Sequence, residues 1–453
     1  MFHKLRQSNQ IDMTAGSIIR KEIQFIIPLI ITATLQLLYN AVDIIVVGKF
    51  AGTTALSAVG STSQLINLLI NVFIGLSIGT SVTTALYFGA KDRENMQRTV
   101  HTSVMVAIIG GIFLMVLGYL VCPTLLRWMG TPSDVIDQSV LYMRIFFMGM
   151  PFNLVYNFCA AVLRAVGDTK HPMEFLAVAG VVNVVLNLVF VINFHMGVAG
   201  VALATIIAQG VSVVLVIRCL MHNEEGLKIE LSKLRIYKTQ LKMIVRIGLP
   251  AGIQSSFFSI SNVLIQSSIN SFGAIAMAGN AASSNLEGFI FTAMNCVHQS
   301  AVTFAGQNLG AKKHERVKKN LYYCFGIVTV VGVSMCIVFR IFGVQLMNLY
   351  SNDAEAIQIG LNRLFFFCNC YFLCGIMDVM TGHLRGIGYS VFPMIVSMCG
   401  VCVFRVIWVL GVFSQIHTLK ILYISYPVSW VMSSVVLFLY YQLVAKKKAL
   451  SQL

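Results

Sequence analysis

Residues 89–94 read Gly-Ala-Lys-Asp-Arg-Glu, and this segment returns at residues 310–315 as Gly-Ala-Lys-Lys-His-Glu, 221 positions later. A second segment follows the same spacing. Leu-Arg-Ala-Val-Gly at residues 163–167 returns as Leu-Arg-Gly-Ile-Gly at residues 384–388. Because 221 is about half of the 453-residue chain, these matches indicate a tandem duplication with one structural unit per copy.

The composition is that of a membrane protein. Hydrophobic residues make up 57% of the chain and charged residues only 11%, with a mean hydropathy of +0.81, far outside the range of globular proteins. Apolar stretches of about 20 residues or more, long enough to cross about 30 Å of hydrocarbon, recur along the whole length. We predict an all-α polytopic membrane protein whose twelve spans are residues 23–48, 57–83, 99–121, 138–161, 172–194, 197–219, 244–270, 277–304, 320–343, 359–383, 392–413 and 418–443.

The net charge of +15 reflects membrane topology rather than a nucleic-acid partner. Basic residues gather in the termini and after every second span, as in Lys91 and Arg93, Lys312 and Lys313, and residues 446–448. This is the pattern of the positive-inside rule. It predicts a multi-pass protein of the cytoplasmic membrane with both termini in the cytoplasm.

The widest polar connection, residues 221–243, falls between the two copies. We therefore expect an N-lobe of residues 1–220, a cytoplasmic linker of residues 221–243 and a C-lobe of residues 244–453. Six spans per lobe give both copies the same orientation, so a pseudo-two-fold axis along the membrane normal relates the two six-helix bundles. Paired lobes of this kind indicate a transporter with a cavity between them that alternates in access.

Two prolines fall inside predicted spans, Pro28 in the first and Pro250 in the seventh, 222 positions apart. Each removes a backbone hydrogen bond and leaves either a static kink or a hinge. Pro28 is our hinge candidate. Intramembrane glycines such as Gly75 and Gly79 are expected to allow close helix contacts.

The first half contains a polar cluster at membrane depth. Asp43, Asn187 and Thr205 lie about 7, 10 and 12 Å below the outer ends of their spans at 1.5 Å per residue, and Asn183 is one turn deeper than Asn187. These oxygen-rich side chains suit Na⁺ at Asp43, whereas a single desolvated aspartate suits a proton. A third interpretation is a hydrogen-bond network that only joins helices.

The second half has its own buried acids, Glu287 and Asp378, with Asn262 and Gln266 as polar candidates nearby. Because charge at membrane depth costs several kcal/mol unless it is paired, each acid is a candidate for a substrate or proton site. A structural pair is the alternative.

Several segments resemble one family. Ile-Pro-Leu at residues 27–29, Tyr-Asn-Ala-Val-Asp at 39–43, the loop at 163–170 and the segment at 197–205 are similar to the MATE (multidrug and toxic compound extrusion) transporters. The resemblance covers essentially the whole chain. It implies a V-shaped fold and the efflux of organic cations in exchange for Na⁺ or H⁺.

Carried over by position, Asp43, Asn183, Asn187 and Thr205 match a first-lobe cation site of that family, and Pro28 matches a proline at which the first helix bends. One departure is that relatives often have aspartate at the position of Asn187. This chain therefore has one negative charge fewer there, which favours proton coupling through Asp43.

The predicted function is a secondary antiporter that exports amphipathic, cationic small molecules, working as a monomer among lipids with H⁺ or Na⁺ as coupling ion and no cofactor. The alternative is a flippase of a lipid-linked precursor, for which the intramembrane cations Arg144, Arg340, Arg363 and Arg405 are candidates. The sequence shows no phosphate-binding loop, no His–carboxylate metal motif and no nucleophile elbow, so it does not predict an enzyme.

Overall fold

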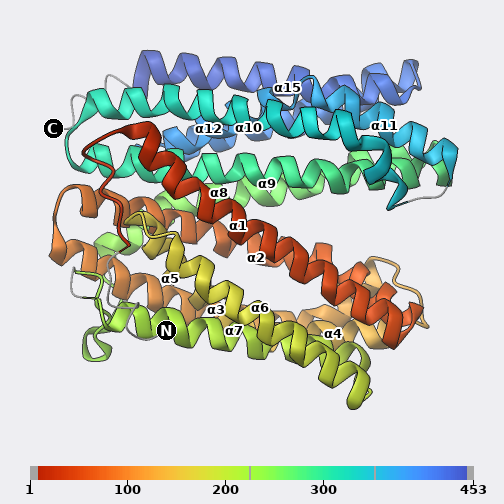
Figure 1. The fold of residues 1–453 in the computed structure, drawn as a ribbon, viewed down its shortest axis with the longest axis horizontal. Coiled ribbons are helices and arrows are strands. Elements are labelled where there is room, and N and C mark those ends of the chain that lie inside the picture. Colours follow the sequence, from red (N-terminus) through yellow and green to blue (C-terminus); the bar gives the residue numbers. More distant parts are fainter. Residues whose placement is uncertain (1–8, 224–225, 351–352, 446–453) are drawn as a thin grey trace. The chain divides into compact units, whose positions relative to one another are not determined.

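The computed structural model describes residues 9–223, 226–350 and 353–445, and these parts contain helices and no strand (Figure 1). The first half is built from α1 (Ile18–Val46), α2 (Thr53–Gly89), α3 (Arg93–Trp128), α4 (Ile136–Met148), α5 (Met150–Ala165), α6 (Lys170–Leu188) and α7 (Gly197–Met221). Short π-helical turns extend α1 and α6, namely η2 (Val47–Ala51) and η3 (Val189–Asn193).

The second half repeats this order. Its helices are α8 (Lys238–Asn270), α9 (Ala274–Gly310), α10 (His314–Asn348), α11 (Ala354–Cys368), α12 (Tyr371–Gly386), α13 (Val391–Ser397), α14 (Phe404–Trp408) and α15 (Leu419–Tyr440). The π-helical segments η5 (Met398–Val403) and η6 (Val409–Phe413) join α13 and α14 into one long run, and η7 (Tyr441–Ala445) extends α15. A single 3-10 turn, η4 (Leu231–Lys233), lies in the linker.

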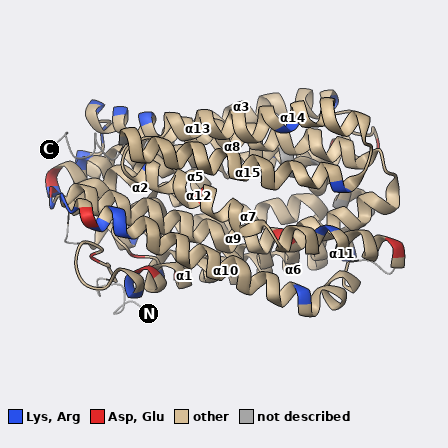
Figure 2. Cartoon of the chain, turned by 90° about the horizontal axis from the view of Figure 1, so that it is seen from above, with Lys and Arg blue, Asp and Glu red and all other residues tan. Residues whose placement is uncertain are grey.

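Each predicted span coincides with one helical run or, for the fourth and tenth spans, with a bent pair of helices. Within the described residues, nine helices are long and apolar enough to cross a membrane, and the bent pairs α4–α5 and α11–α12 raise the number to eleven. The remaining predicted span, α9, does not reach this apolar threshold, and it carries Asn280, Glu287 and His298 at buried positions. Figure 2 shows the same segregation, with Lys, Arg, Asp and Glu mainly at helix ends.

The duplication extends to backbone angles. Lys91 and Lys312, in the two copies of the Gly-Ala-Lys turn, are both left-handed, with φ of 56° and 58°. The next residue of the turn has diverged, from Asp92 to Lys313. Asp92 caps α3 by accepting hydrogen bonds from the Asn95 side chain and backbone, which hold the pKa of Asp92 below its usual value, whereas Lys313 caps α10 with no side-chain bond.

The fourth and tenth spans are broken, which the sequence analysis did not predict. The chain bends by 48° at Gly149, between α4 and α5, and by 51° between α11 and α12, at residues 369–370. The two breaks lie 221 positions apart, like the repeated turns. Pro151 explains the first break because it cannot donate a backbone hydrogen bond to the preceding turn.

Glycines bring α2 and α8 together, as expected for small residues in lipid. A Cβ added to Gly75 would lie 2.2 Å from the Gly252 nitrogen, and one added to Gly79 would lie 2.2 Å from the Ile244 carbonyl oxygen. Gly248 fits equally closely against the α2 backbone. The two Gly-x-x-x-Gly pairs, 75/79 and 248/252, therefore form one close backbone contact.

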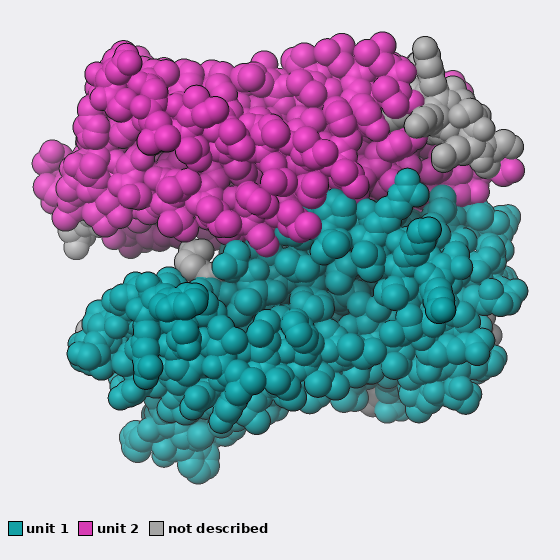
Figure 3. Space-filling model, turned by 180° about the vertical axis from the view of Figure 1, so that it is seen from behind, with its two compact units in different colours: residues 1–12, 27–252 teal, residues 13–26, 253–453 magenta. Residues whose placement is uncertain are grey.

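The chain forms two compact units (Figure 3). Unit 1 comprises Met1–Asp12 and Ile27–Gly252, and unit 2 comprises Met13–Ile26 and Ile253–Leu453. One division lies between Asp12 and Met13, before α1, and the other two fall inside α1 and α8, close to Pro28 and Pro250, so none falls in the linker. The lobe limits at residues 220 and 244 remain a prediction.

Segments that lead into α1 and α8 are well anchored. In unit 2, the Met13 N–H donates to Gln307 Oε1 (3.0 Å), and the Arg316 guanidinium donates to the Met13 and Gly16 carbonyls (3.0 Å each). In unit 1, the linker binds α3, where the Glu230 N–H donates to His101 Nε2 (3.1 Å). Both leading segments therefore dock by backbone hydrogen bonds.

Candidate functional site

The four polar residues predicted in the first half lie together in unit 1. Asn187 of α6 donates its Nδ2 hydrogens to the Asp43 carboxylate of α1 and to Asn183 Oδ1 (3.2 Å). Asn183 in turn donates to the Thr205 hydroxyl of α7 (3.4 Å). Three helices are thus joined by one chain of hydrogen bonds that ends at a carboxylate.

This chain of polar groups is partly buried. Asn187 is fully buried and Asn183 is buried, while Asp43 and Thr205 are half-buried. Among the described residues no Lys, Arg or His forms an ion pair with Asp43. Asn187 Oδ1 is buried without a hydrogen-bond partner, so the cluster keeps one free acceptor beside its only carboxylate.

A cavity of about 260 Å³ opens onto the cluster. Asp43, Asn183 and Thr205 line it, together with polar side chains that include Tyr39, Asn40, Asn153, Asn157 and Gln209. Its volume lies just below the range of about 300–1,000 Å³ that drug-sized ligands need. The space is large enough for several water molecules or a small ion beside the cluster.

The sequence analysis missed the remaining wall of this cavity. Tyr39 lies one turn before Asp43 on α1, and its ring packs on Gly180, where an added Cβ would come within 1.7 Å of a ring carbon. Asn157 of α5 donates to the Asn153 carbonyl (2.9 Å). Intramembrane amides spaced four residues apart on one helix face would have indicated this lining.

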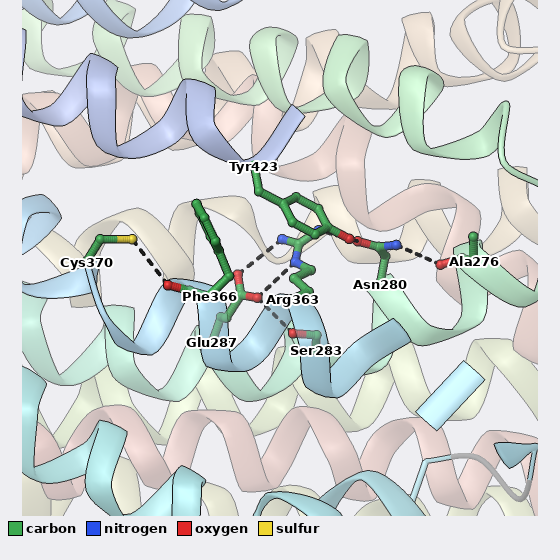
Figure 4. A network of polar contacts seen from close by, with 8 residues as sticks. All are labelled: Ala276, Asn280, Ser283, Glu287, Arg363, Phe366, Cys370 and Tyr423. Atoms are coloured by element: carbon green, nitrogen blue, oxygen red, sulfur yellow. Dashed lines mark hydrogen bonds and ion pairs between the residues drawn. The ribbon is translucent and has the colours of Figure 1, made fainter. Parts of the chain in front are cut away.

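In the second half, Glu287 is bound in an ion pair (Figure 4). Arg363 of α11 donates from Nε (2.8 Å) and Nη2 (3.1 Å) to the two Glu287 oxygens, and Ser283 donates to Oε1 (2.9 Å). Arg363 also donates to Asn280 Oδ1 (3.1 Å), which accepts from the Tyr423 hydroxyl (2.7 Å). This geometry fits the structural pair, because both charges are buried and mutually neutralised.

The structure does not bring the other second-half candidates to Glu287. Asn262 and Gln266 are exposed on α8, and Gln266 donates to Asn270 (2.9 Å). Asp378 is on α12, where its backbone carbonyl contacts the His298 ring nitrogen (2.7 Å). The sequence placed these residues inside spans, but it did not predict which face of the helix each one occupies.

The sequence analysis did not name two buried acids, Glu22 and Asp168. Glu22 is fully buried in unit 2, with Oε1 accepting from the Cys324 thiol (3.3 Å) and Oε2 without a partner. It was overlooked because the first span was predicted to begin one residue later. Across the described residues, no group of three His, Cys, Asp or Glu side chains is arranged to hold a metal.

Comparison with known proteins gives a consistent result. The MatE family model matches residues 28–189 and 250–409. The probable multidrug resistance protein YoeA of Bacillus subtilis is 27% identical over 438 residues, covering 95% of this chain and 94% of that protein. The probable multidrug resistance protein NorM of Thermotoga maritima is 25% identical over 389 residues, covering 84% and 83%.

A solved structure shares the fold. The outward-facing conformation of a multidrug resistance MATE family transporter of the MOP superfamily superposes with a TM-score of 0.90 at 21% identity, covering 98% of this chain and 99% of that one. The match confirms the predicted all-α architecture of twelve helices in two six-helix bundles. Two homologous halves, apolar helices and the matching family model lead to one conclusion: the chain belongs to the MATE family, whose members are membrane transporters and not enzymes.

Proposed function

We propose that this protein is a secondary antiporter that exports amphipathic, positively charged small molecules in exchange for H⁺ or Na⁺. The names of its relatives, which include multidrug export and multidrug resistance proteins, support the substrate class. The observation that supports ion coupling is Asp43, a carboxylate without a cationic partner on the wall of a polar cavity.

The hydrogen-bond pattern favours H⁺ over Na⁺. Asn187 presents an N–H group to Asp43, which suits a carboxylate, whereas Na⁺ requires several oxygen atoms aimed at one point. A protonated Asp43 becomes a donor and needs an acceptor. Asn187 Oδ1 is a buried acceptor without a partner, so rotation of this one amide would serve both protonation states.

Protonation therefore couples to the packing of α1 against α6. In the proposed cycle, a proton from outside neutralises Asp43, the Asn187 amide turns, and the unit shifts toward the state that releases substrate outside. Binding of the next substrate in the inward-open state displaces the proton to the cytoplasm. The driving force is about 2.3 kcal/mol per charge for 100 mV, and about 1.4 kcal/mol for each unit of pH difference.

Pro28 is the proposed hinge of this movement. It lies two residues beyond the point at which α1 passes from unit 2 to unit 1, and Asp43 follows it on the same helix. The Thr32 hydroxyl donates to the Pro28 carbonyl (2.7 Å). A bond of this kind bends a helix when the hydroxyl competes with a backbone N–H for the same carbonyl.

The test is efflux of a fluorescent cation such as ethidium from proteoliposomes under imposed gradients. We expect a pH gradient to drive efflux in the wild type, and Asp43→Asn to abolish the response to that gradient. Efflux driven by Na⁺ alone would identify the other coupling ion. Indifference of the wild type to both gradients would contradict antiport, and a wild-type rate in Asp43→Asn would contradict the role of Asp43.

Three of the four arginines named for the flippase alternative give it no support. Arg363 is neutralised by Glu287, and Arg340 donates to Asn369 (2.7 Å) from an exposed position. Arg144 stacks on Tyr119 in unit 1, with its guanidinium carbon 4.7 Å from the ring centroid. Arg405, the fourth, is buried, and no described carboxylate forms an ion pair with it.

A further inference from the structure

We propose that the linker surface, formed by residues 226–242 of unit 1, binds the headgroups of anionic phospholipids, and that this contact orders the first turns of α8. The partner is a lipid of the surrounding membrane and not an exported molecule. Three features support such a surface: the depth at which the linker is anchored, the side chains that it exposes, and the placement of its arginine.

The backbone of the linker is fixed against α3 and the core of unit 1. The Tyr237 N–H donates to the Thr102 hydroxyl (3.1 Å), in addition to the Glu230 bond described above. Leu227 and Ile229 are buried in the hydrophobic core, with exposed fractions of 0% and 3%. The side chains that stay exposed are therefore held on a defined backbone.

This anchoring places the linker near the boundary between headgroups and acyl chains. The charged residues at the start of α3 end at Arg98, and residues 99–126 contain no Lys, Arg, Asp or Glu. Thr102, which binds Tyr237, lies one helical turn beyond Arg98. Because charged side chains stay out of the hydrocarbon, the linker contacts α3 at the level where the polar region of the bilayer ends.

Two apolar side chains of the linker are exposed at this level. Leu231 is 67% exposed and Ile236 is 39% exposed, whereas Leu234 between them packs against the core. Apolar surface gains free energy when it leaves water, and the acyl region is the apolar phase within reach. A segment that exposes both apolar and basic residues is typical of chains that lie in the membrane interface.

The exposed basic residues of the linker are complementary to an anionic membrane surface. Glu230 is the one acid among residues 226–242, and it already binds Lys233 (2.7 Å). Within the described parts of the chain, no carboxylate forms an ion pair with the exposed residues Lys228, Arg235, Lys238 and Lys242. The predicted orientation places them at the cytoplasmic leaflet, whose anionic lipids attract clusters of Lys and Arg.

Two guanidinium groups meet at the Tyr237 ring. The guanidinium carbons of Arg98 and Arg235 lie 5.6 and 4.6 Å from the ring centroid. Arg98 also binds Glu94, one turn before it on α3, whereas Arg235 is one of the cations without an acid. Arginine binds phosphate through paired hydrogen bonds from its planar fork, so a phosphodiester beside this ring would neutralise Arg235.

An occupied linker surface would order α8 because α8 starts at the same ring. The Leu241 N–H donates to the Tyr237 carbonyl (2.9 Å), and α8 begins at Lys238 with no acid in its first turn. Lys238 and Lys242 lie four residues apart, so two like charges are neighbours at the end of the helix where the dipole is also positive. An anionic headgroup offsets this repulsion.

The experiment measures equilibrium binding of short-chain phosphatidylglycerol to the purified full-length protein in detergent, with phosphatidylcholine of the same chain length as the neutral probe. We expect the wild type to prefer phosphatidylglycerol. Arg235→Gln combined with Lys238→Gln should weaken its binding by about 30-fold, since each basic residue near an anionic surface contributes about fivefold. Lys318→Gln combined with Lys319→Gln is the matched control, because it removes the same charge from α10 and should leave the affinity unchanged.

A further variant distinguishes a lipid from a soluble anion. Leu231→Ser combined with Ile236→Ser keeps every charge but should weaken phosphatidylglycerol binding by about tenfold. Wild-type affinity in this variant, or displacement of phosphatidylglycerol by inorganic phosphate at equal ionic strength, would show a soluble-anion site and overturn the proposal. Equal loss in the two charge variants, or equal wild-type affinity for the two lipids, would also overturn it.

Hydrogen exchange on the same samples tests the effect on α8. Phosphatidylglycerol should slow amide exchange of residues 238–245 in the wild type, but not in the variant that lacks Arg235 and Lys238. Binding without this protection would overturn the ordering of α8. Neither measurement depends on transport, so a negative result here would leave the proposed export function standing, and the efflux experiment tests that function separately.

Discussion

At the scale of single residues, the proposed preference for H⁺ over Na⁺ rests on Asn187. It presents one N–H to Asp43 and holds one buried oxygen without a partner. An aspartate in place of Asn187 would have two carboxylate oxygens and no N–H donor facing Asp43. The negative charge and the oxygen count of the site would both rise, and these are the two properties that Na⁺ requires.

Asn187→Asp is therefore expected to convert the response from a pH gradient toward a Na⁺ gradient. Two adjacent carboxylates repel each other, and Na⁺ relieves that repulsion by binding between them. The measurement is Na⁺-driven ethidium efflux together with ²²Na⁺ binding. Asn157→Asp is the matched control, because Asn157 lines the same cavity but donates to Asn153 and not to Asp43. An equal Na⁺ response in both variants would attribute the effect to the general charge of the cavity.

At the scale of helices, the close contact of α2 with α8 is a consequence of four glycines. Their spacing places the backbones in contact with no side chain between them. Such a contact has no room for a methyl group, since the atoms that would collide are backbone atoms and cannot change rotamer.

Gly75→Ala should thus lower the free energy of unfolding by about 1–3 kcal/mol, the usual cost of overpacking. Thermal unfolding in detergent is the measurement. Gly60→Ala on the same helix is its control, because nothing lies within 4 Å of an added Cβ there, and alanine's higher helix propensity should leave stability unchanged or raised. Equal destabilisation of both variants would contradict the importance of the α2–α8 contact.

At the scale of the whole molecule, α1 and α8 each belong to two units, and both change unit near a proline. A helix that is shared in this way must bend when its two ends move apart. Proline removes a backbone hydrogen bond of the helix at that point. The helix therefore bends there more easily than it breaks its packing contacts on either side.

Pro28→Ala is expected to slow transport by about tenfold, or about 1.4 kcal/mol of activation free energy, which is less than the roughly 3 kcal/mol that proline costs a helix interior. Substrate affinity should change little, because Pro28 does not line the cavity. Turnover and equilibrium binding measured on the same preparation distinguish the two effects. Pro123→Ala is the control, since Pro123 lies inside α3 and that helix stays within unit 1, and an equal slowing there would argue against a specific hinge.

Helix geometry explains which features could be predicted from the sequence and which could not. Apolar length and repeated turns predicted every span, and depth arithmetic predicted that Asp43, Asn187 and Thr205 converge, because 1.5 Å per residue fixes height along a helix. Height does not fix the face. The sequence therefore did not reveal that Arg363 neutralises Glu287, that Asn262 is exposed, or that Arg405 is buried, since each depends on how neighbouring helices are rotated.

The anchoring of Met13 and Gly16 by Gln307 and Arg316 also constrains how the protein is made. The segment that leads into α1 leaves the ribosome first, but its partners are encoded almost 300 residues later. At about 5–20 residues per second, it waits roughly 15–60 seconds for them. Unit 2 cannot be completed from the C-terminal half alone, so a chain cut in the linker would need both fragments to be synthesised in the same cell.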